Sequence, residues 1–342
     1  MTDQTKGQST GRLSPFRSIA GKVQGAKYRG KAGSYLLAIL VLITLSYFLP
    51  RLLPGDFVTS MYSGAPVTLT ALQEAELKAF YAKQEGFGRY VANLLSLNWG
   101  YSYAFLAPVS RLVFDALPWT LLLIGSAHLL ASIFGFIAGV EAAWRGGVFE
   151  KVGVWFMTLL EGIPEMCLGV LLLLFFALHL GWFPAAGAET AYGRLTSFEA
   201  VLDVIHHLIL PLATLIVAYL PGNFLLARGS MIMTMGLPFV TTARAKGLTP
   251  RRVRYAHGAR NALLPLATRF GLRIGFLLTG ALVVETVFSY PGLGTLLFKS
   301  IAMRDLPLIQ GIVLFSSALI LAVNLALEFL YGWLDPRVRH AS

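Results

Sequence analysis

The chain has 342 residues, of which 56% are hydrophobic and 13% charged, and its formal net charge is +11. Together with a mean hydropathy of +0.67, this composition excludes a soluble domain and predicts an integral membrane protein. It also argues against a membrane β-barrel, whose sequence alternates in segments of about ten residues. We therefore expect an all-α membrane protein.

Segments apolar enough to cross a bilayer recur along the chain. A helix needs about 20 apolar residues to span the hydrocarbon core. Six segments qualify, at 33–53, 116–140, 152–180, 208–227, 262–284 and 306–327. They predict about six transmembrane helices: a first helix at 33–53, and five more within a core at 116–334.

Basic residues flank these segments unevenly. The tail at 1–32 contains seven lysines and arginines against one acidic residue, Asp3. The loop at 236–265 holds six more, and the short tail at 335–342 adds Arg337 and Arg339. Because positively charged loops stay on the cytoplasmic side, both termini and this loop are predicted to be cytoplasmic. Much of the net charge then reflects topology, and no nucleic-acid partner is expected.

The segment at 54–115, between the first two predicted spans, should form a small outer subdomain. Thr70 and Gln73 fit a capping box, and partly helical spacing follows up to Lys83. Two interpretations of this subdomain remain open. It is either a packed cap over the membrane helices or a docking surface for an external partner.

Two of the predicted spans carry internal charges. Glu161 and Glu165 lie in the third span, and Arg269 and Arg273 lie in the fifth. A spacing of four places each pair on one helix face. Because an unpaired charge in a span costs about 2.5–3.5 kcal/mol, we hypothesise that the glutamates pair with the arginines, directly or through water in a transport path. A structural ion-pair clamp and a gate or substrate-contact role both remain open.

The basic loop at 236–265 predicts a helix-turn-helix at the membrane surface. Pro238 suits the first turn of a short helix, and Gly247 suits its left-handed end. Thr249 would cap a second helix that begins at Pro250. That helix would carry an apolar strip of Val253, Ala256 and Ala259. A cationic strip of Arg251, Arg254 and His257 would lie beside it.

Three kinds of partner fit this cationic surface: anionic lipid head groups, DNA, and a cytoplasmic protein that grips the loop. DNA fits least, because a loop tethered between two membrane spans cannot easily enter a DNA groove and contact the bases.

Other polar residues in apolar surroundings are harder to assign. His206 and His207 are adjacent, so they cannot both face one metal ion from a regular helix. We expect no metal site and no cofactor, and His128 and His179 should be packed or interfacial. For Glu285, at the outer end of the fifth span, a pore-mouth or outer-gate role and a helix-end hydrogen bond both remain open.

The basic loop resembles the cytoplasmic "EAA" coupling loop of ABC importer permeases, in the version of the peptide and nickel importer family. Thr242-Ala-Arg-Ala-Lys-Gly-Leu248 is followed by His257, by Arg260-Asn-Ala-Leu263 and by Pro265, as in that family. The resemblance extends over nearly everything after the basic tail. Further blocks in family order are Leu52-Leu-Pro-Gly-Asp56, Gly100-Tyr-Ser102, Glu285 to Gly294, Pro307 to Gly311, and Leu334 to Arg337.

The resemblance implies a type I ABC importer permease in a bacterial or archaeal cell membrane. Such a subunit forms half of a heterodimeric pore with a second homologous permease, and it works with two ATPase subunits and an extracytoplasmic binding protein. The cargo would be a peptide or a related small solute. The residues of the ATPase-coupling loop would then be Thr242, Ala243, Arg244, Ala245, Lys246, Gly247, Arg251, His257, Arg260 and Asn261.

The chain itself is not expected to be an enzyme, because it contains no Gly-x-x-x-x-Gly-Lys-Ser/Thr phosphate loop. The alternative function is a proton-coupled secondary transporter that uses the intramembrane Glu/Arg pairs. Such transporters usually contain internal repeats, and the sequence shows none.

Departures from the family pattern fall in two places. Ahead of the loop, Met233 and Pro238 stand where the family usually has Glu and Asp, and Thr241 stands where it usually has Arg, which puts the detailed ATPase contacts in doubt. In the third span, Gly162-Ile-Pro-Glu165 replaces the usual Ser-Ile-Pro-Ser, and in the fifth span Arg269 and Arg273 occupy positions that are usually apolar or Gln.

Overall fold

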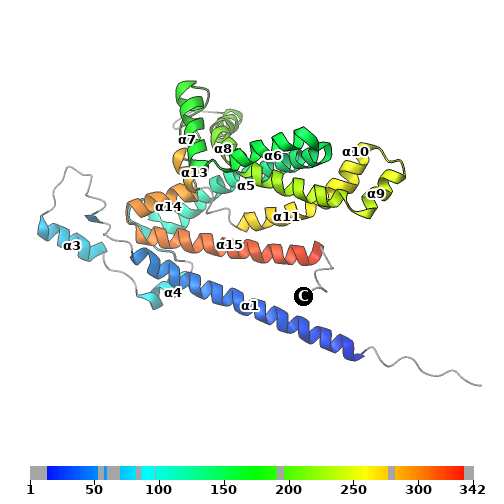
Figure 1. The fold of residues 1–342 in the computed structure, drawn as a ribbon. Coiled ribbons are helices and arrows are strands. Elements are labelled where there is room, and N and C mark those ends of the chain that lie inside the picture. Colours follow the sequence, from blue (N-terminus) through cyan, green and yellow to red (C-terminus); the bar gives the residue numbers. More distant parts are fainter. Residues whose placement is uncertain are drawn as a thin grey trace, which may run out of the picture.

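The computed structural model describes residues 14–52, 58–59, 70–81, 86–96, 98–190, 196–275 and 282–334, and these are largely helical (Figure 1). The predicted all-α class is confirmed. One antiparallel pair of short strands, β1 (Tyr101–Ser102) and β2 (Ala107–Pro108), interrupts the helices. The helices are α1 (Ser14–Arg51), α3 (Ala71–Tyr81), α4 (Phe87–Leu95), α5 (Val109–Arg145), α6 (Gly147–Glu161), α7 (Glu165–Leu172), η1 (Leu173–His179), α8 (Ser197–Met235), α9 (Pro238–Ala245), α10 (Pro250–Arg252), η2 (Val253–Ala259), α11 (Arg260–Gly275), α13 (Leu282–Val287), α14 (Leu293–Ala302) and α15 (Leu306–Leu334).

Several of these helices are long and apolar enough to cross a membrane. Among the described residues, four qualify singly, at Gly33–Arg51, Val109–Arg145, Ser197–Met235 and Leu306–Ala326. A bent pair, Gly147–Glu161 and Glu165–His179, meets the same criteria when taken together, as a broken span or a re-entrant loop. The predicted span at 262–284 corresponds to most of α11 and the start of α13, and residues 276–281 between them lie outside the described residues. The chain is a multi-pass membrane protein.

The predicted span at 152–180 is not one regular helix, because the helices Gly147–Glu161 and Glu165–His179 meet at an angle of 91°. The break lies at Gly162, Ile163 and Pro164. Proline has no backbone N–H and disfavours a helical conformation in the residue before it, so the helix ends there and a new one starts. Glu161 and Glu165 therefore flank a sharp bend and do not share one regular helix face.

The centre of the fold is the packing of α5 against α8, which contact each other along their length (Figure 1). Two glycines of α5 let the backbones approach. A Cβ at Gly135 would lie 2.7 Å from the Cβ of Asn223, and a Cβ at Gly139 would lie 2.5 Å from the carbonyl oxygen of Phe224. Close approach through small residues is how membrane helices gain packing energy, so α5 and α8 form one tightly joined unit.

Gly139→Ala should therefore lower the free energy of unfolding by about 1–3 kcal/mol, the usual cost of overpacking. The matched control is Gly125→Ala in the same helix, where a Cβ would meet nothing within 4 Å. Unfolding of the detergent-solubilised protein by denaturant would measure both variants. Equal stability of the two would contradict the close packing of α5 on α8.

The two ends of the molecule differ in structure. The β-hairpin, α3 and α4 lie at one end, whereas α9 and α10 lie at the other, where α1 begins and α15 ends (Figure 1). The predicted capping box is confirmed at the start of α3: the backbone N–H of Gln73 donates to Thr70 Oγ1 at 3.4 Å, and Thr70 N–H donates to Gln73 Oε1 at 3.1 Å. The helix ends at Tyr81, and Lys83 lies outside the described residues.

Buried Asp305 joins the hairpin to α15. Its Oδ2 accepts hydrogen bonds from Ser102 Oγ at 2.6 Å and from the Ala104 N–H at 3.0 Å. Its Oδ1 accepts from the Leu308 N–H at 3.2 Å, in the first turn of α15. One carboxylate thus caps a spanning helix and fixes the hairpin at its end.

Candidate functional site

The basic loop has the predicted helix-turn-helix form. Pro238 is the first residue of α9, and Pro250 is the first residue of α10. Between them, Gly247 has a φ of +71°, a left-handed conformation that glycine adopts without steric cost. Thr249 occupies the N-cap position of α10, but its side chain makes no capping hydrogen bond. Local proline and glycine signals thus set the loop's path.

The second helix of the loop differs from the prediction. After α10 the backbone continues as the π-helix η2 and then as α11. Val253 and Ala259 are buried as expected, but Ala256 is exposed, and Gly258 is buried instead. The reason is the wider turn of a π-helix, in which the i→i+5 hydrogen bonds rotate later residues away from their α-helical positions.

A small apolar core holds the two loop helices together. Buried Val240 and Ala243 of α9 pack with buried Val253 of η2, and Leu248 and Trp144 cover them. Trp144 belongs to the last turn of α5, so this core also joins the loop to a spanning helix. Arg244 and Arg254 place their guanidinium carbons 5.5 and 5.2 Å from the Trp144 ring centroid, within cation–π range.

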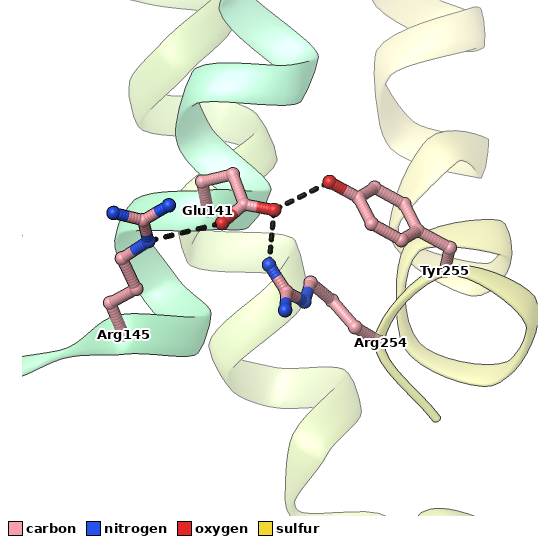
Figure 2. Close-up of polar contacts among 4 residues, drawn as sticks. All are labelled: Glu141, Arg145, Arg254 and Tyr255. Carbon is pink, nitrogen blue, oxygen red and sulfur yellow. Dashed lines mark hydrogen bonds and ion pairs between the residues drawn. The ribbon is translucent and has the colours of Figure 1, made fainter. Parts of the chain in front are cut away.

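Glu141 of α5 makes the main polar connection to the loop (Figure 2). Its Oε1 accepts hydrogen bonds from the guanidinium of Arg254 and, at 2.5 Å, from the hydroxyl of Tyr255. Its Oε2 accepts from Arg145 Nε at 3.2 Å. The hydrogen bond to Glu141 raises the pKa of Tyr255, which keeps the phenol protonated as a donor. The loop is therefore bound to α5 by a charge-assisted cluster and not only by its covalent ends.

The rest of the loop presents a cationic outer surface. Ala243 is the one fully buried member of the predicted coupling residues, and His257 is half-buried. Asn261 is exposed and donates through Nδ2 to the His257 carbonyl at 2.8 Å. The remaining predicted residues are exposed: Thr242, Arg244, Ala245, Lys246, Gly247, Arg251 and Arg260.

The charged residues of the predicted third and fifth spans do not form the direct ion pairs that we expected. Among the described residues, no salt bridge joins Glu161 or Glu165 to Arg269 or Arg273. The bend at Pro164 places the two glutamates on different helices, but Glu161 still acts electrostatically on Arg269 and Glu165 on Arg273, so pairing through water stays a prediction. Arg269 and Arg273 instead line a pocket between α5, α8 and α11.

Glu285 makes helix-end hydrogen bonds, which is one of the two roles that the sequence left open for it; the other was a pore-mouth or outer-gate role. It is completely buried, and its Oε2 accepts from the backbone N–H groups of Gly294 at 2.7 Å and Thr295 at 3.2 Å, in the first turn of α14. Its Oε1 accepts from Thr120 Oγ1 of α5 at 2.7 Å. Thr120 in turn accepts from the Leu293 N–H at 2.7 Å. Glu285 therefore joins three helices.

The adjacent histidines have local partners in the N-terminal part of α8. His206 Nε2 lies 2.9 Å from the carbonyl oxygen of Trp182, and His207 Nδ1 lies 2.9 Å from that of Asp203. No group of three or more metal-ligating side chains occurs in the part of the chain that the structure describes.

Sequence reasoning missed Glu141, Trp144 and Tyr255. One signal was present: Glu141 is an acidic residue near the end of a long apolar helix, four residues before Arg145. That spacing indicates a helix-surface pair. It does not reveal Arg254, which is more than 100 residues further along the chain.

Residues 131–340 match the family model described as "Binding-protein-dependent transport system inner membrane component". The chain is 36% identical to the di/tripeptide transport system permease protein DppB of Pseudomonas aeruginosa, with 86% of this chain and 93% of the relative covered. It is 35% identical to the oligopeptide transport system permease protein AppB of Bacillus subtilis, with 89% and 96% covered.

A third relative, the glutathione transport system permease protein GsiC of Salmonella paratyphi A, is 34% identical, with 88% of this chain and 95% of the relative covered. These similarities give no support to a proton-coupled secondary transporter. The chain thus belongs to the inner-membrane components of binding-protein-dependent transport systems, and it is a transmembrane permease subunit of an ABC importer.

Proposed function

We propose that this chain forms half of a translocation pore for peptides or related small solutes, and that its loop at 236–265 receives the motion of a partner ATPase. The relatives named above handle di/tripeptides, oligopeptides and glutathione, which are all peptide-like solutes. A second homologous permease would complete the pore, two ATPase subunits would supply the energy, and an extracytoplasmic binding protein would deliver the cargo. ATP hydrolysis would lie entirely in those partners.

The observation that carries this proposal is the exposed cationic loop held firmly to α5. Glu141 and Trp144 attach α9 and η2 to the end of α5, and α8 continues into α9 through Gly236 and Leu237. Because α5 and α8 pack backbone to backbone, a pull on the loop moves both helices together. Nucleotide-driven closure of the ATPases would thus reach the pore as a rigid-body motion.

The proposed orientation places both termini and the loop in the cytoplasm of a bacterial cell with the subunit in its inner membrane. Three features support it: the basic tail at 1–32, the basic loop, and the position of the loop at the end where α1 begins and α15 ends (Figure 1). The segment at 54–115 would then form the outer subdomain, near the binding protein.

The departures from the family pattern bear on how an ATPase would be held. Met233, Pro238 and Thr241 are all exposed, so they lie where a partner would contact them. None of the three carries a charge. We therefore assign the polar contacts to the cationic residues that remain, chiefly Arg244, Lys246 and Arg251, with acidic residues of the partner as their complement.

Cross-linking would test this assignment. In a Cys167→Ser background, Ala256→Cys places a thiol on the exposed side of η2, and Ser96→Cys places a control thiol at the opposite end of the molecule. In membranes that contain the whole importer, benzophenone-4-maleimide attached to the thiol should, on irradiation, trap an ATPase subunit at Ala256→Cys and not at Ser96→Cys. Trapping at neither thiol, or at Ser96→Cys alone, would contradict the proposed coupling loop.

A further inference from the structure

We infer that Arg269 and Arg273 form a binding site for a carboxylate group of the cargo, inside the membrane-spanning part of the molecule. This inference rests on the proposed importer function and specifies the chemistry of its pore.

The site is a narrow, partly open crevice between three helices, and a cargo carboxylate would meet it at its open side, where Arg273 is exposed. His128 comes from α5, Tyr219 and Asn223 come from α8, and both arginines come from α11. His128 lies near the middle of α5, and Tyr219 and Asn223 lie near the middle of α8. The pocket therefore lies at mid-length of both spanning helices, far from either membrane surface.

Neighbouring groups hold both guanidinium groups in this pocket. Arg269 packs against Gly222, where an added Cβ would lie 2.3 Å from Nη2 and would displace the guanidinium. The guanidinium carbon of Arg273 lies 5.8 Å from the centroid of the Tyr219 ring. His128 stacks on the same ring, with centroids 4.3 Å apart and planes only 6° from parallel. Tyr219 is thus a rigid platform between a histidine and an arginine.

No carboxylate contacts the two arginines directly in the described part of the chain. Neither forms a salt bridge within 4.0 Å; Glu161 acts on Arg269 and Glu165 on Arg273 only at longer range, and the two arginines repel each other. Guanidinium groups without a hydrogen-bonded carboxylate are costly at this depth, and an anion between them removes that cost. The planar fork of a guanidinium fits a carboxylate with two parallel hydrogen bonds, and every peptide with a free C-terminus carries a carboxylate.

The depth of the pocket favours the cargo over a lipid as the source of the anion. Lipid phosphates lie at the membrane surface, about 15 Å from the bilayer centre. The remaining alternatives are a carboxylate of the second permease subunit and Glu161 or Glu165 of this chain, and the experiment below separates both from the cargo.

Uptake by the complete importer in proteoliposomes provides the first measurement. We expect the double variant Arg269→Gln/Arg273→Gln to take up trialanine at least about tenfold more slowly, because two charge-assisted hydrogen bonds are lost. Arg269→Lys/Arg273→Lys should retain part of the rate, since the charges remain. Arg111→Gln, at an exposed position outside the pocket, should transport like the wild type. Stimulation of ATP hydrolysis by the loaded binding protein should persist in every variant.

Photolabelling provides a second measurement that needs neither ATP nor the binding protein. Benzoylphenylalanyl-dialanine and its C-terminal amide would be added to the detergent-solubilised importer. The acid should label α8 and α11 about tenfold more than the amide does, and the glutamine variant should abolish that difference. Equal labelling by acid and amide in the wild type would overturn the inference, and it is the result expected if a carboxylate of the second subunit, or Glu161 or Glu165, fills the pocket.

Wild-type uptake in the glutamine variant would also overturn the inference while leaving the proposed importer function intact. Failure of the importer function would instead show as a wild-type complex without ATP-dependent uptake, and the acid-to-amide ratio in photolabelling would then still decide whether the carboxylate site exists.

Discussion

Glu141→Gln should uncouple the importer, with ATP-dependent uptake about tenfold or more below that of the wild type while the ATPase subunits still bind. The neutral amide loses the charge that holds Arg254 and weakens the acceptor for Tyr255, and hydrogen bonds to charged groups contribute about 1.5–3 kcal/mol each. The loop would keep its own apolar core of Val240, Ala243 and Val253, so its outer surface should remain intact. Uptake and ATP hydrolysis in the same proteoliposomes would measure the two effects separately.

The matched control is Arg145→Gln, which changes the same cluster without touching the loop. Arg145 is about half exposed and bonds Glu141 from within α5, so its loss should alter uptake less than twofold. A cycle with Arg254→Gln adds a second check, because the double variant should be milder than the sum of the two single variants. Glu141→Gln with normal uptake, or with loss of ATPase binding, would contradict this role.

Sequence reasoning succeeded where the structural cause is local. Pro238 and Pro250 begin the loop helices, and Gly247 turns the chain between them, because each residue restricts or frees its own backbone. The capping box of Thr70 and Gln73 is local in the same sense. The membrane-spanning segments were equally predictable, since a run of about 20 apolar residues usually forms a transmembrane helix.

Sequence reasoning failed where the backbone departs from a regular α-helix inside an apolar or basic segment. The third span reads as one apolar segment on both sides of Pro164, and its length hid the helix break at that proline. The single helix face predicted for Glu161 and Glu165 is lost at the break. Ala256 is exposed because it lies in a π-helix, and the residue spacing in the sequence does not predict the wider turn of a π-helix.

The candidate site was predictable only on its outer surface. The exposed cations of the loop are visible as a charge pattern, and the family resemblance assigned them to an ATPase contact. The attachment of the loop to α5 was not predictable, because Glu141 and Arg254 come into contact only after α5, α8 and the loop have packed together. Contacts between residues so distant in sequence are set by the tertiary fold.

Glu285→Ala should lower the free energy of unfolding by about 3–5 kcal/mol, the largest effect that we expect on stability. Its carboxylate is the acceptor for two backbone N–H groups of α14 and for Thr120, and each buried donor left without a partner costs about 1–3 kcal/mol. Gly292 and Gly294 pack directly against this side chain, so the truncation would also leave a cavity. Denaturant unfolding in detergent would measure the change.

Glu285→Gln distinguishes this role from a charge-dependent gate. The amide oxygen can still accept from Gly294 and Thr295, while the NH2 group meets the Thr120 hydroxyl, so stability should fall by only about 1–2 kcal/mol. Thr120→Val removes the third helix from the junction and should cost a similar amount, because the Leu293 N–H loses its acceptor. If Glu285→Ala unfolds like the wild type but transports poorly, the residue acts in the pore and not as the junction of α5, α13 and α14. If glutamine proves as damaging to stability as alanine, the negative charge itself holds the three helices together.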